Sequence, residues 1–240
     1  MTTEPPTTET PAAATVPPAV IEVHVPGSIN TWADLGFDVT EGVVALERCS
    51  VRPAMERLAL GIATSGPKRG GTAAGASREL PAHWLGIPLV KVHPHTRSAS
   101  TPSPHRNGVR GVDHIVVMTT DLDATVAAIH SMGWEIRRQR PTTMLGFEVV
   151  QLFVWAGAAL LEVVCASEPN EFIREPVLWG VSLAADDLDA TVEFLGERIG
   201  APRDAVQKGR RIATVRRRGT DLGLEVAIMS PHRQEPGSDG

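Results

Sequence analysis

The sequence predicts an α+β protein in which a strand–helix–three-strand unit, βαβββ, occurs twice in tandem. The six residues DLDATV begin at Asp121 and again at Asp187, 66 residues later. The three residues LEV likewise occur at Leu161–Val163 and at Leu224–Val226, 63 residues apart. Two motifs that repeat at nearly the same period indicate an internal duplication, in which each copy forms one supersecondary unit.

Each copy begins with a strand-like run that leads into a helix. VDHIVVMTT precedes the first DLDATV and LWGVSLAAD precedes the second, and both runs are rich in apolar and β-branched residues. Asp121 and Asp187 are expected N-caps, because a short carboxylate accepts hydrogen bonds from the free N–H groups of a first helical turn. Gly133 and Gly200 stand where the two helices are expected to end.

Strand-like runs also follow each helix. In the first copy they are EIRRQR, GFEVVQLFVWAG and ALLEVVCA, and in the second they are RRIATVRRRG and LGLEVAIMS. The repeated unit is therefore a strand, a helix and about three strands. One module is expected over residues 111–168 and the other over residues 177–231.

Low-complexity segments separate this duplicated domain from a weaker N-terminal unit. Residues 1–19 and 232–240 are expected to be disordered tails and residues 93–110 a linker, because Pro and small polar residues are frequent there. Residues 20–92 are expected to form a degenerate, partial βαββ unit. Its parts are VIEVHV as a strand, SINTWADL as a short helix and FDVTEGVVALER as a hairpin that turns at EG. We expect this unit to serve in packing or in oligomer contacts.

Composition limits the classes of function. The formal net charge of -5 argues against a general nucleic-acid binder, which is normally basic. No apolar run approaches the roughly 20 residues that cross a bilayer, and the first residues lack the pattern of a secretory signal. Cys49 and Cys165 have no metal-type spacing, which suits two buried thiols in a reducing compartment. We therefore expect a cytoplasmic protein without nucleic-acid or membrane partners.

The tandem repeat, with HxxV in its first strand, DLDAT opening the helix and LEV in the last strand, resembles the vicinal oxygen chelate superfamily. That superfamily includes glyoxalase I, bleomycin-resistance proteins, extradiol dioxygenases and methylmalonyl-CoA epimerase. The resemblance covers about residues 111–231. It implies an open, barrel-like mixed sheet around one cavity, with the helices outside. The resemblance also leaves open whether the protein forms a homodimer, although two full modules in one chain suffice to build one cavity.

The metal enzymes of this superfamily place their ligands on the first and last strands of each module. These positions correspond here to His114, Glu162, Gly180 and Glu225. Glycine cannot ligate a metal, and it argues against an extradiol dioxygenase, which would have histidine there. The resemblance therefore implies a site of one imidazole and two carboxylates, which suits Mn, Fe, Ni, Co or Zn. The alternative is that these three residues are structural.

Residues beside the expected ligands are candidates for contacting a substrate. Alternate side chains of a strand share a face, which groups Val116 and Met118 with His114. Ser182 is the nearest polar residue on the same face of the strand that holds Gly180.

A basic run, KGRRIATVRRRG, lies in the second module. Because guanidinium groups bind carboxylates and phosphates in bidentate fashion, Arg211 or Arg216 is a candidate anchor for an anionic ligand at the cavity mouth. The alternative is a charge run that keeps an edge strand from unwanted pairing. The histidines of the low-complexity segments, His105 among them, are expected to be solvated.

Two classes of function remain open. One is a divalent-metal-dependent lyase, isomerase or epimerase that acts on a small carbonyl compound, in which Glu225 by analogy removes a proton beside the carbonyl. The other is a metal-free protein, similar to bleomycin-resistance proteins, that sequesters a small ligand in the cavity. Trp179 slightly favours the second class, because its ring can fill the space that a ligand at Gly180 would occupy.

Overall fold

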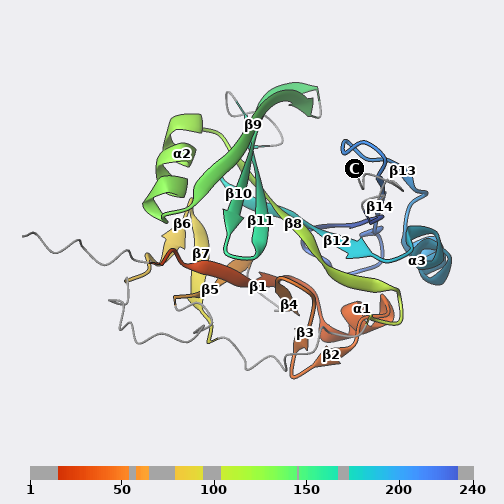
Figure 1. The fold of residues 1–240 in the computed structure, drawn as a ribbon. Coiled ribbons are helices and arrows are strands. Elements are labelled where there is room, and N and C mark those ends of the chain that lie inside the picture. Colours follow the sequence, from red (N-terminus) through yellow and green to blue (C-terminus); the bar gives the residue numbers. More distant parts are fainter. Residues whose placement is uncertain are drawn as a thin grey trace, which may run out of the picture.

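The computed structural model describes residues 16–53, 58–64, 79–93, 104–144, 146–166 and 173–231. Most of the expected tails and of the expected linker therefore lie outside the described residues. The described chain forms two mixed β-sheets, one from the N-terminal part and one from the duplicated part. In Figure 1 the N-terminal sheet, coloured red to yellow, lies beneath the main sheet, coloured green to blue.

The main sheet is built from eight strands and two helices. They are β8 (Val109–Thr119), α2 (Leu122–Ser131), β9 (Glu135–Met144), β10 (Phe147–Ala156), β11 (Ala159–Ala166), β12 (Val177–Ala185), α3 (Leu188–Leu195), the 3-10 turn η1 (Gly196–Arg198), β13 (Arg203–Asp204), β14 (Arg211–Thr214) and β15 (Glu225–Met229). The strand order is β13-β14-β15-β12-β8-β11-β10-β9.

The two halves of the main sheet have the same connectivity. β8 lies parallel to β11 in one half, and β12 lies parallel to β15 in the other. β8 and β12 pair antiparallel at the centre and join the halves into one open sheet. The predicted fold class, α+β with tandem βαβββ modules, is confirmed.

The repeated aspartates cap their helices as the sequence predicts. Asp121 accepts a hydrogen bond from a first-turn backbone N–H at 2.9 Å, and Asp187 accepts two. The first helix ends before Gly133, as expected. The second ends earlier than expected, at Gly196 instead of Gly200, because Gly196 adopts a left-handed backbone with φ +56°.

The N-terminal sheet has seven strands in the order β2-β3-β4-β1-β5-β7-β6. Its elements are β1 (Ala19–Val25), α1 (Ile29–Asp34), β2 (Val39–Thr40), β3 (Val43–Val44), β4 (Ser50–Pro53), β5 (Ala59–Ala63), β6 (His83–Trp84) and β7 (Ile87–Lys91). β1 is parallel to β4 and antiparallel to β5, and β5 is parallel to β7. The same pairings recur in the main sheet, so this unit is more complete than the expected βαββ fragment. Its strands are too short for their periodicity to stand out in the sequence.

One core lies between the two sheets and their helices. Ile115 and Val117 of β8 point into this core, whereas His114, Val116 and Met118 point to the opposite side. We call that opposite side of the main sheet, turned away from the N-terminal sheet, the far face.

Tryptophans and a linker histidine join the N-terminal unit to the main sheet. Trp134 donates a hydrogen bond to the carbonyl of Pro18 at 2.7 Å, and its ring packs against that of Trp84 at 5.2 Å. His105 was expected to be solvated, but it is buried, with Nδ1 accepting from the backbone N–H of Asp38 at 3.1 Å. The low-complexity sequence around His105 gives no sign of this contact, because the partner residue, Asp38, lies 67 residues earlier.

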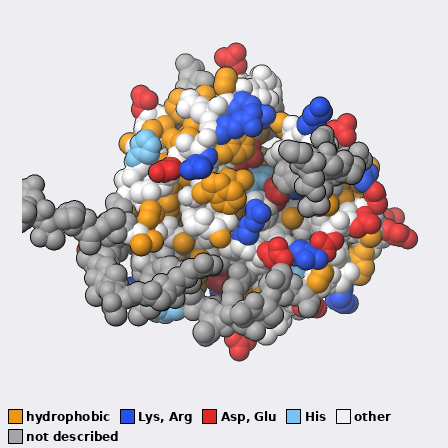
Figure 2. All heavy atoms as spheres, viewed as in Figure 1, with side chains coloured by type: hydrophobic (Ala, Val, Ile, Leu, Met, Phe, Trp, Pro, Cys, Tyr) orange, Lys and Arg blue, Asp and Glu red, His pale blue; other side chains and the backbone are white. Residues whose placement is uncertain are grey.

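The surface is mixed in character. Figure 2 shows acidic and basic side chains interspersed with apolar ones on the face that it presents. The large exposed apolar side chains, such as Trp155, Phe194 and Val206, come from separate elements, as is usual for a protein surface. None of the helices in the described ranges has the length and hydrophobicity needed to span a membrane.

Glu22 is a buried carboxylate at the centre of the N-terminal sheet. It accepts hydrogen bonds from Arg52 Nε at 2.7 Å and from His24 Nε2 at 2.8 Å. Burial alone raises the pKa of Glu22, but the hydrogen bonds and charges of His24 and Arg52 outweigh burial and lower the pKa below its ordinary value of 4.5.

We predict that Glu22→Gln destabilises the protein by about 1–3 kcal/mol near neutral pH. A carboxylate whose pKa is lower in the folded than in the unfolded state stabilises the folded protein at pH values above the unfolded-state pKa. This stabilisation is lost as the pH falls through the folded-state pKa. The difference in unfolding free energy should therefore shrink below pH 4.5. Urea unfolding of the native and variant proteins at several pH values measures this difference. A difference that does not change with pH would contradict an ionised Glu22 held by His24 and Arg52.

Candidate functional site

His114 of β8 and Glu162 of β11 meet on the far face of the main sheet. Nε2 of His114 lies 3.3 Å from Oε2 of Glu162. The two side chains are only 10% and 11% exposed. The parallel register of β8 and β11 sets this contact, because Glu162 stands opposite Val116 and its side chain shares a face with the imidazole two residues earlier.

A second carboxylate holds the other nitrogen of His114. Oδ2 of Asp113 lies 2.8 Å from Nδ1 of His114, and Oδ1 accepts a hydrogen bond from Nη2 of the buried Arg210 at 2.6 Å. The register between β8 and β12 shifts at this point, so that Asp113 is an extra residue on β8. Such a bulge re-aims a side chain, which explains why consecutive residues reach the same site.

The charge state of Asp113 fixes the tautomer of His114. Burial alone raises the pKa of Asp113, but hydrogen bonds from His114 and Arg210, together with their charges, hold the pKa well below its ordinary value. An ionised carboxylate only accepts hydrogen bonds, so Nδ1 of His114 carries a proton and donates it. Metal-binding and acid–base histidines are both commonly oriented by a carboxylate in this way.

The contact between His114 and Glu162 consequently requires a proton or a cation. With Nδ1 as donor, a neutral imidazole presents a lone pair at Nε2, and the carboxylate of Glu162 presents another. Two lone pairs at 3.3 Å repel each other unless one of the groups carries a proton or a bound cation lies between them. The pair is therefore built to hold a proton or a cation on the far face.

Two residues that sequence reasoning missed extend this site. Nε2 of Gln151, on β10, donates to Oε1 of Glu162 at 2.6 Å. Arg140, on the edge strand β9, donates to Oε1 of Gln151 through Nε at 3.0 Å and also through Nη2. A single polar residue in the apolar run VVQLFVW was the available signal for Gln151. The resulting polar chain runs Arg140, Gln151, Glu162, His114, Asp113, Arg210.

Glu225, the third expected ligand, does not join the pair. It lies in the same row of the sheet as Glu162, but Val116 and Gly180 stand between them. Three strand spacings span roughly 14 Å along a flat sheet. Arg217 instead pairs with Glu225 at 3.1 Å. Within the described ranges, no group of three or more His, Cys, Asp or Glu side chains is arranged to hold a metal ion.

Three of the expected substrate-contacting residues lie on the far face. Ser182 stands opposite His114 across the β8–β12 pair, and its hydroxyl is buried without a hydrogen-bond partner among the described residues. Val116 is partly exposed beside the pair. Met118 is buried in a small apolar cluster that includes Val164, which leaves it little surface for a ligand.

The two expected anion anchors lie elsewhere. Arg211 pairs with Asp189 of helix α3 at 2.5 Å. Nε of Arg216 donates to the carbonyl of Ile199 at 3.2 Å, and the side chain lines a separate cavity of about 660 Å³. Strand alternation alone did not show this, because β14 ends at Thr214 and the alternation does not extend to Arg216.

No protein-family model and no curated protein matches the sequence. The structure is similar to methylmalonyl-CoA epimerase from Mycobacterium tuberculosis, with 18% identity and a TM-score of 0.41 over 57% of this chain and 93% of that one. The epimerase from Streptomyces coelicolor, solved with 2-nitronate-propionyl-CoA, gives 20% identity and a TM-score of 0.39 over 50% and 96%.

A third similar structure covers the whole length of this chain. It is a xylose isomerase-like TIM barrel/4-hydroxyphenylpyruvate dioxygenase fusion protein, with 13% identity and a TM-score of 0.55 over 99% of this chain and 52% of that one. This chain thus spans about half of the fusion protein. The similarity shows a shared fold that includes the N-terminal sheet.

We predict that Gln151→Met lowers the free energy of unfolding by about 1–3 kcal/mol, because it removes the donor to Oε1 of Glu162 and the acceptor of Arg140. Glu225→Gln is the matched control: it breaks a more exposed ion pair, which typically changes stability by less than about 1 kcal/mol. Chemical denaturation of the three proteins measures both effects. Equal effects of the two substitutions would contradict a buried polar chain.

Proposed function

We propose that this protein binds a small carbonyl compound on the far face and moves a proton at the carbon next to the carbonyl, as an isomerase or epimerase does. The single observation that carries the proposal is the contact of His114 with Glu162, backed by Asp113. A histidine that is oriented by one carboxylate and faces a second is a pair suited to general acid–base work. The shared fold with proteins named epimerase and dioxygenase supports the proposal only at the level of architecture.

The residues of the site take distinct roles in this proposal. The carboxylate of Glu162 takes the proton from the carbon, and the electron pair of the broken C–H bond moves to the carbonyl oxygen. The unpartnered hydroxyl of Ser182 is available to donate to the resulting oxyanion. Return of the proton from Glu162 to the same carbon completes an exchange. Return to a neighbouring carbon that bears a hydroxyl, with the proton of one oxygen passing to the other as the new carbonyl forms, completes an isomerisation. Gln151 and His114 keep the carboxylate in place during both transfers.

The resemblance implies a divalent metal, but the donor set does not fit one of the expected kind. His114 and Glu162 supply two ligands, Gly180 supplies none, and Glu225 is paired with Arg217. Transition-metal sites of this type usually have three protein ligands. The proposed proton transfer is therefore assigned to the side chains of the chain itself, and Glu162 takes the role that the sequence assigned to Glu225.

Binding without chemistry is the second candidate function, and one observation favours it. Beside the pair, the partly exposed Val116 and Trp179 pack on a buried apolar cluster of Met118, Val149, Val164, Ala166 and Ile173. A face that is partly apolar and partly polar suits sequestration of a small ligand as well as catalysis.

We predict that the native protein catalyses exchange of the α-proton for deuterium in at least one compound from a panel of small 2-oxo acids, hydroxy ketones and acyl thioesters. Because general acid–base groups contribute about 100-fold or more, Glu162→Gln and His114→Gln should each lower the exchange rate by at least that factor. Proton NMR in heavy water measures the rates. Glu225→Gln is the control and should keep the native rate; an equal loss in that variant, or no exchange by the native protein, would contradict the proposal.

We predict that protein dialysed against Zn²⁺, Ni²⁺ or Mn²⁺ and then passed through a desalting column keeps clearly less than one metal ion per chain, because two protein ligands hold these ions weakly. Elemental analysis measures the content. His114→Ala and Glu162→Ala should remove what remains, and Glu225→Ala should not. Stoichiometric metal that is lost in all three variants would restore the three-ligand site and contradict the proposed metal-independent transfer.

A further inference from the structure

We propose that the substrate of the far face carries a carboxylate or a phosphate several bonds from its carbonyl, and that Arg138 and Arg140 of β9 bind this anionic group. The inference rests on the proposed function for its site and deepens it, because it names the class of substrate. Two arginines beside the polar chain carry the inference, since no carboxylate pairs with either of them in the part of the chain that the structure describes.

The register of the main sheet places both arginines on the far face. In the antiparallel pair of β9 and β10, Arg140 stands opposite Gln151 and Arg138 stands opposite Phe153. Residues that stand opposite each other in such a pair project to the same face. Gln151 reaches Glu162 on the far face, and Phe153 stands opposite Glu162 between β10 and β11. The two guanidinium groups therefore share a face with the proposed base.

Arg140 is held in place and keeps a donor available. Nε and Nη2 both donate to Oε1 of Gln151, whereas no contact among the described residues uses Nη1. Arg140 is only partly exposed, and its acceptor is a neutral amide that does not compensate the positive charge. A partly buried cation without a counter-charge favours an anion beside it. Because this side chain is already oriented, binding loses less free energy to ordering.

Arg138 has its whole guanidinium group available. It is exposed, and within the described ranges no hydrogen bond or ion pair engages its side chain. The neighbouring Arg137 differs, because its Nη1 lies 3.3 Å from a carboxylate oxygen of Glu135. Arg138 and Arg140 are two residues apart on one strand, or about 7 Å between Cα atoms, so both can reach one anionic group. Each can donate two parallel hydrogen bonds to a carboxylate or a phosphate.

The charge of the far face differs from that of the whole chain. The chain has a formal net charge of -5. On the far face, however, Arg210 pairs with Asp113 and Arg217 pairs with Glu225. The two arginines of β9 therefore outnumber the remaining carboxylate of the site, Glu162. An excess of positive charge on one face attracts anions to it.

The spacing between the arginines and the proposed base defines the shape of the substrate. The amide group of Gln151 separates the guanidinium group of Arg140 from the carboxylate of Glu162. Their strands, β9 and β11, are two spacings or about 10 Å apart. An anionic group bound by Arg140 consequently lies several bonds from a carbon whose proton reaches Glu162. The substrate class is a carbonyl compound with a carboxylate or a phosphate at its distal end.

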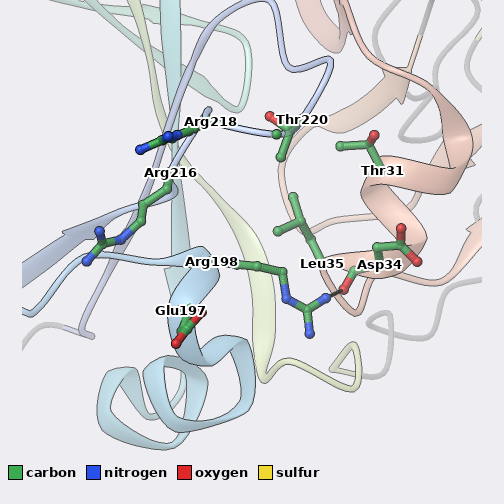
Figure 3. Close-up of a pocket in the computed structure, with 9 residues that line it drawn as sticks. Thr31, Asp34, Leu35, Glu197, Arg198, Arg216, Arg218 and Thr220 are labelled. Carbon is green, nitrogen blue, oxygen red and sulfur yellow. Dashed lines mark hydrogen bonds between the residues drawn. The ribbon is translucent and has the colours of Figure 1, made fainter.

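The cleft beside helix α1 offers no comparable cation. Figure 3 shows the guanidinium groups of Arg216 and Arg218 extending away from α1. Arg198 donates to the backbone carbonyl of Asp34 (Figure 3), and Asp34 and Glu197 belong to the same lining. An anionic substrate is therefore expected at β9 and not in this cleft.

The test compares two pairs of compounds whose members differ in the distal anion. 2-Oxoglutarate is paired with 2-oxopentanoate, and dihydroxyacetone phosphate is paired with dihydroxyacetone. Isothermal titration of the full chain at constant ionic strength measures the four affinities. In at least one pair, we expect the member with the distal anion to bind about 100-fold more tightly, because each arginine contributes about tenfold through charge-assisted hydrogen bonds. The pair that shows this preference identifies carboxylate or phosphate as the recognised group.

Variants of the arginines test which residues cause the preference. Arg138→Gln should reduce it to about tenfold, and Arg138→Gln combined with Arg140→Gln should remove it. Arg203→Gln is the matched control, because it removes an exposed arginine from β13 at the opposite edge of the sheet and changes the net charge equally. This control should keep the native preference. Thermal melting confirms that each variant is folded.

The outcomes separate this inference from the proposed function. No preference in either pair, an unchanged preference in the double variant, or an equal loss in Arg203→Gln would each overturn the inference. Deuterium exchange on the same compounds, at equal rates within both pairs, would also overturn it and leave the proposed function standing. The expected preference in binding, without exchange of any α-proton, would support the anion site and overturn the proposed function.

Discussion

The antiparallel pairing of β8 with β12 is the constraint on which the rest of the site depends. It joins the two βαβββ halves into one sheet, and the bulge at Asp113 lies within it. Without that extra residue, Asp113 and His114 would point to opposite faces of the strand. The same pairing sets Ser182 opposite His114 and buries its hydroxyl beside the imidazole. A purely regular sheet would have separated these groups.

The bulge has an electrostatic consequence that reaches across the sheet. Arg210 and His114 keep Asp113 ionised although it is mostly buried. The ionised carboxylate fixes the donor nitrogen of His114, which leaves Nε2 to face Glu162. Gln151 then occupies the remaining oxygen of Glu162. Each group limits the choices of the next, so the polar chain has few alternative arrangements and is expected to be rigid.

Much of the main sheet could be predicted from the sequence, because local signals were strong. The duplicated DLDATV marked both helix starts, and the apolar runs marked the central strands. His114 and Glu162 were expected in one site because the resemblance implies ligands on the first and last strands of a module, and these strands pair in the structure. The N-terminal sheet was underestimated, since β4 and β5 have only four and five residues and show little periodicity.

The parts that sequence reasoning missed depend on contacts between distant segments. Whether Glu225 reaches the pair depends on the curl of the sheet and on competition from Arg217, and neither is encoded in a local pattern. Arg210 looked like one more member of a basic run, yet it is buried against Asp113, 97 residues away. The cleft at Arg216 and Arg218 is formed with helix α1, whose place beside the second module no repeat predicted.

The most direct test of this account is ¹⁵N NMR of the imidazole of His114 in protein with labelled histidine, assigned through His114→Gln. The account predicts a proton bonded to Nδ1 and hydrogen-bonded to the ionised Asp113. This hydrogen bond should be lost in Asp113→Asn. Resonances that show a proton on Nε2 and none on Nδ1 would contradict it. His114 would then donate only to Glu162, and the orientation on which the proposed proton transfer rests would be absent.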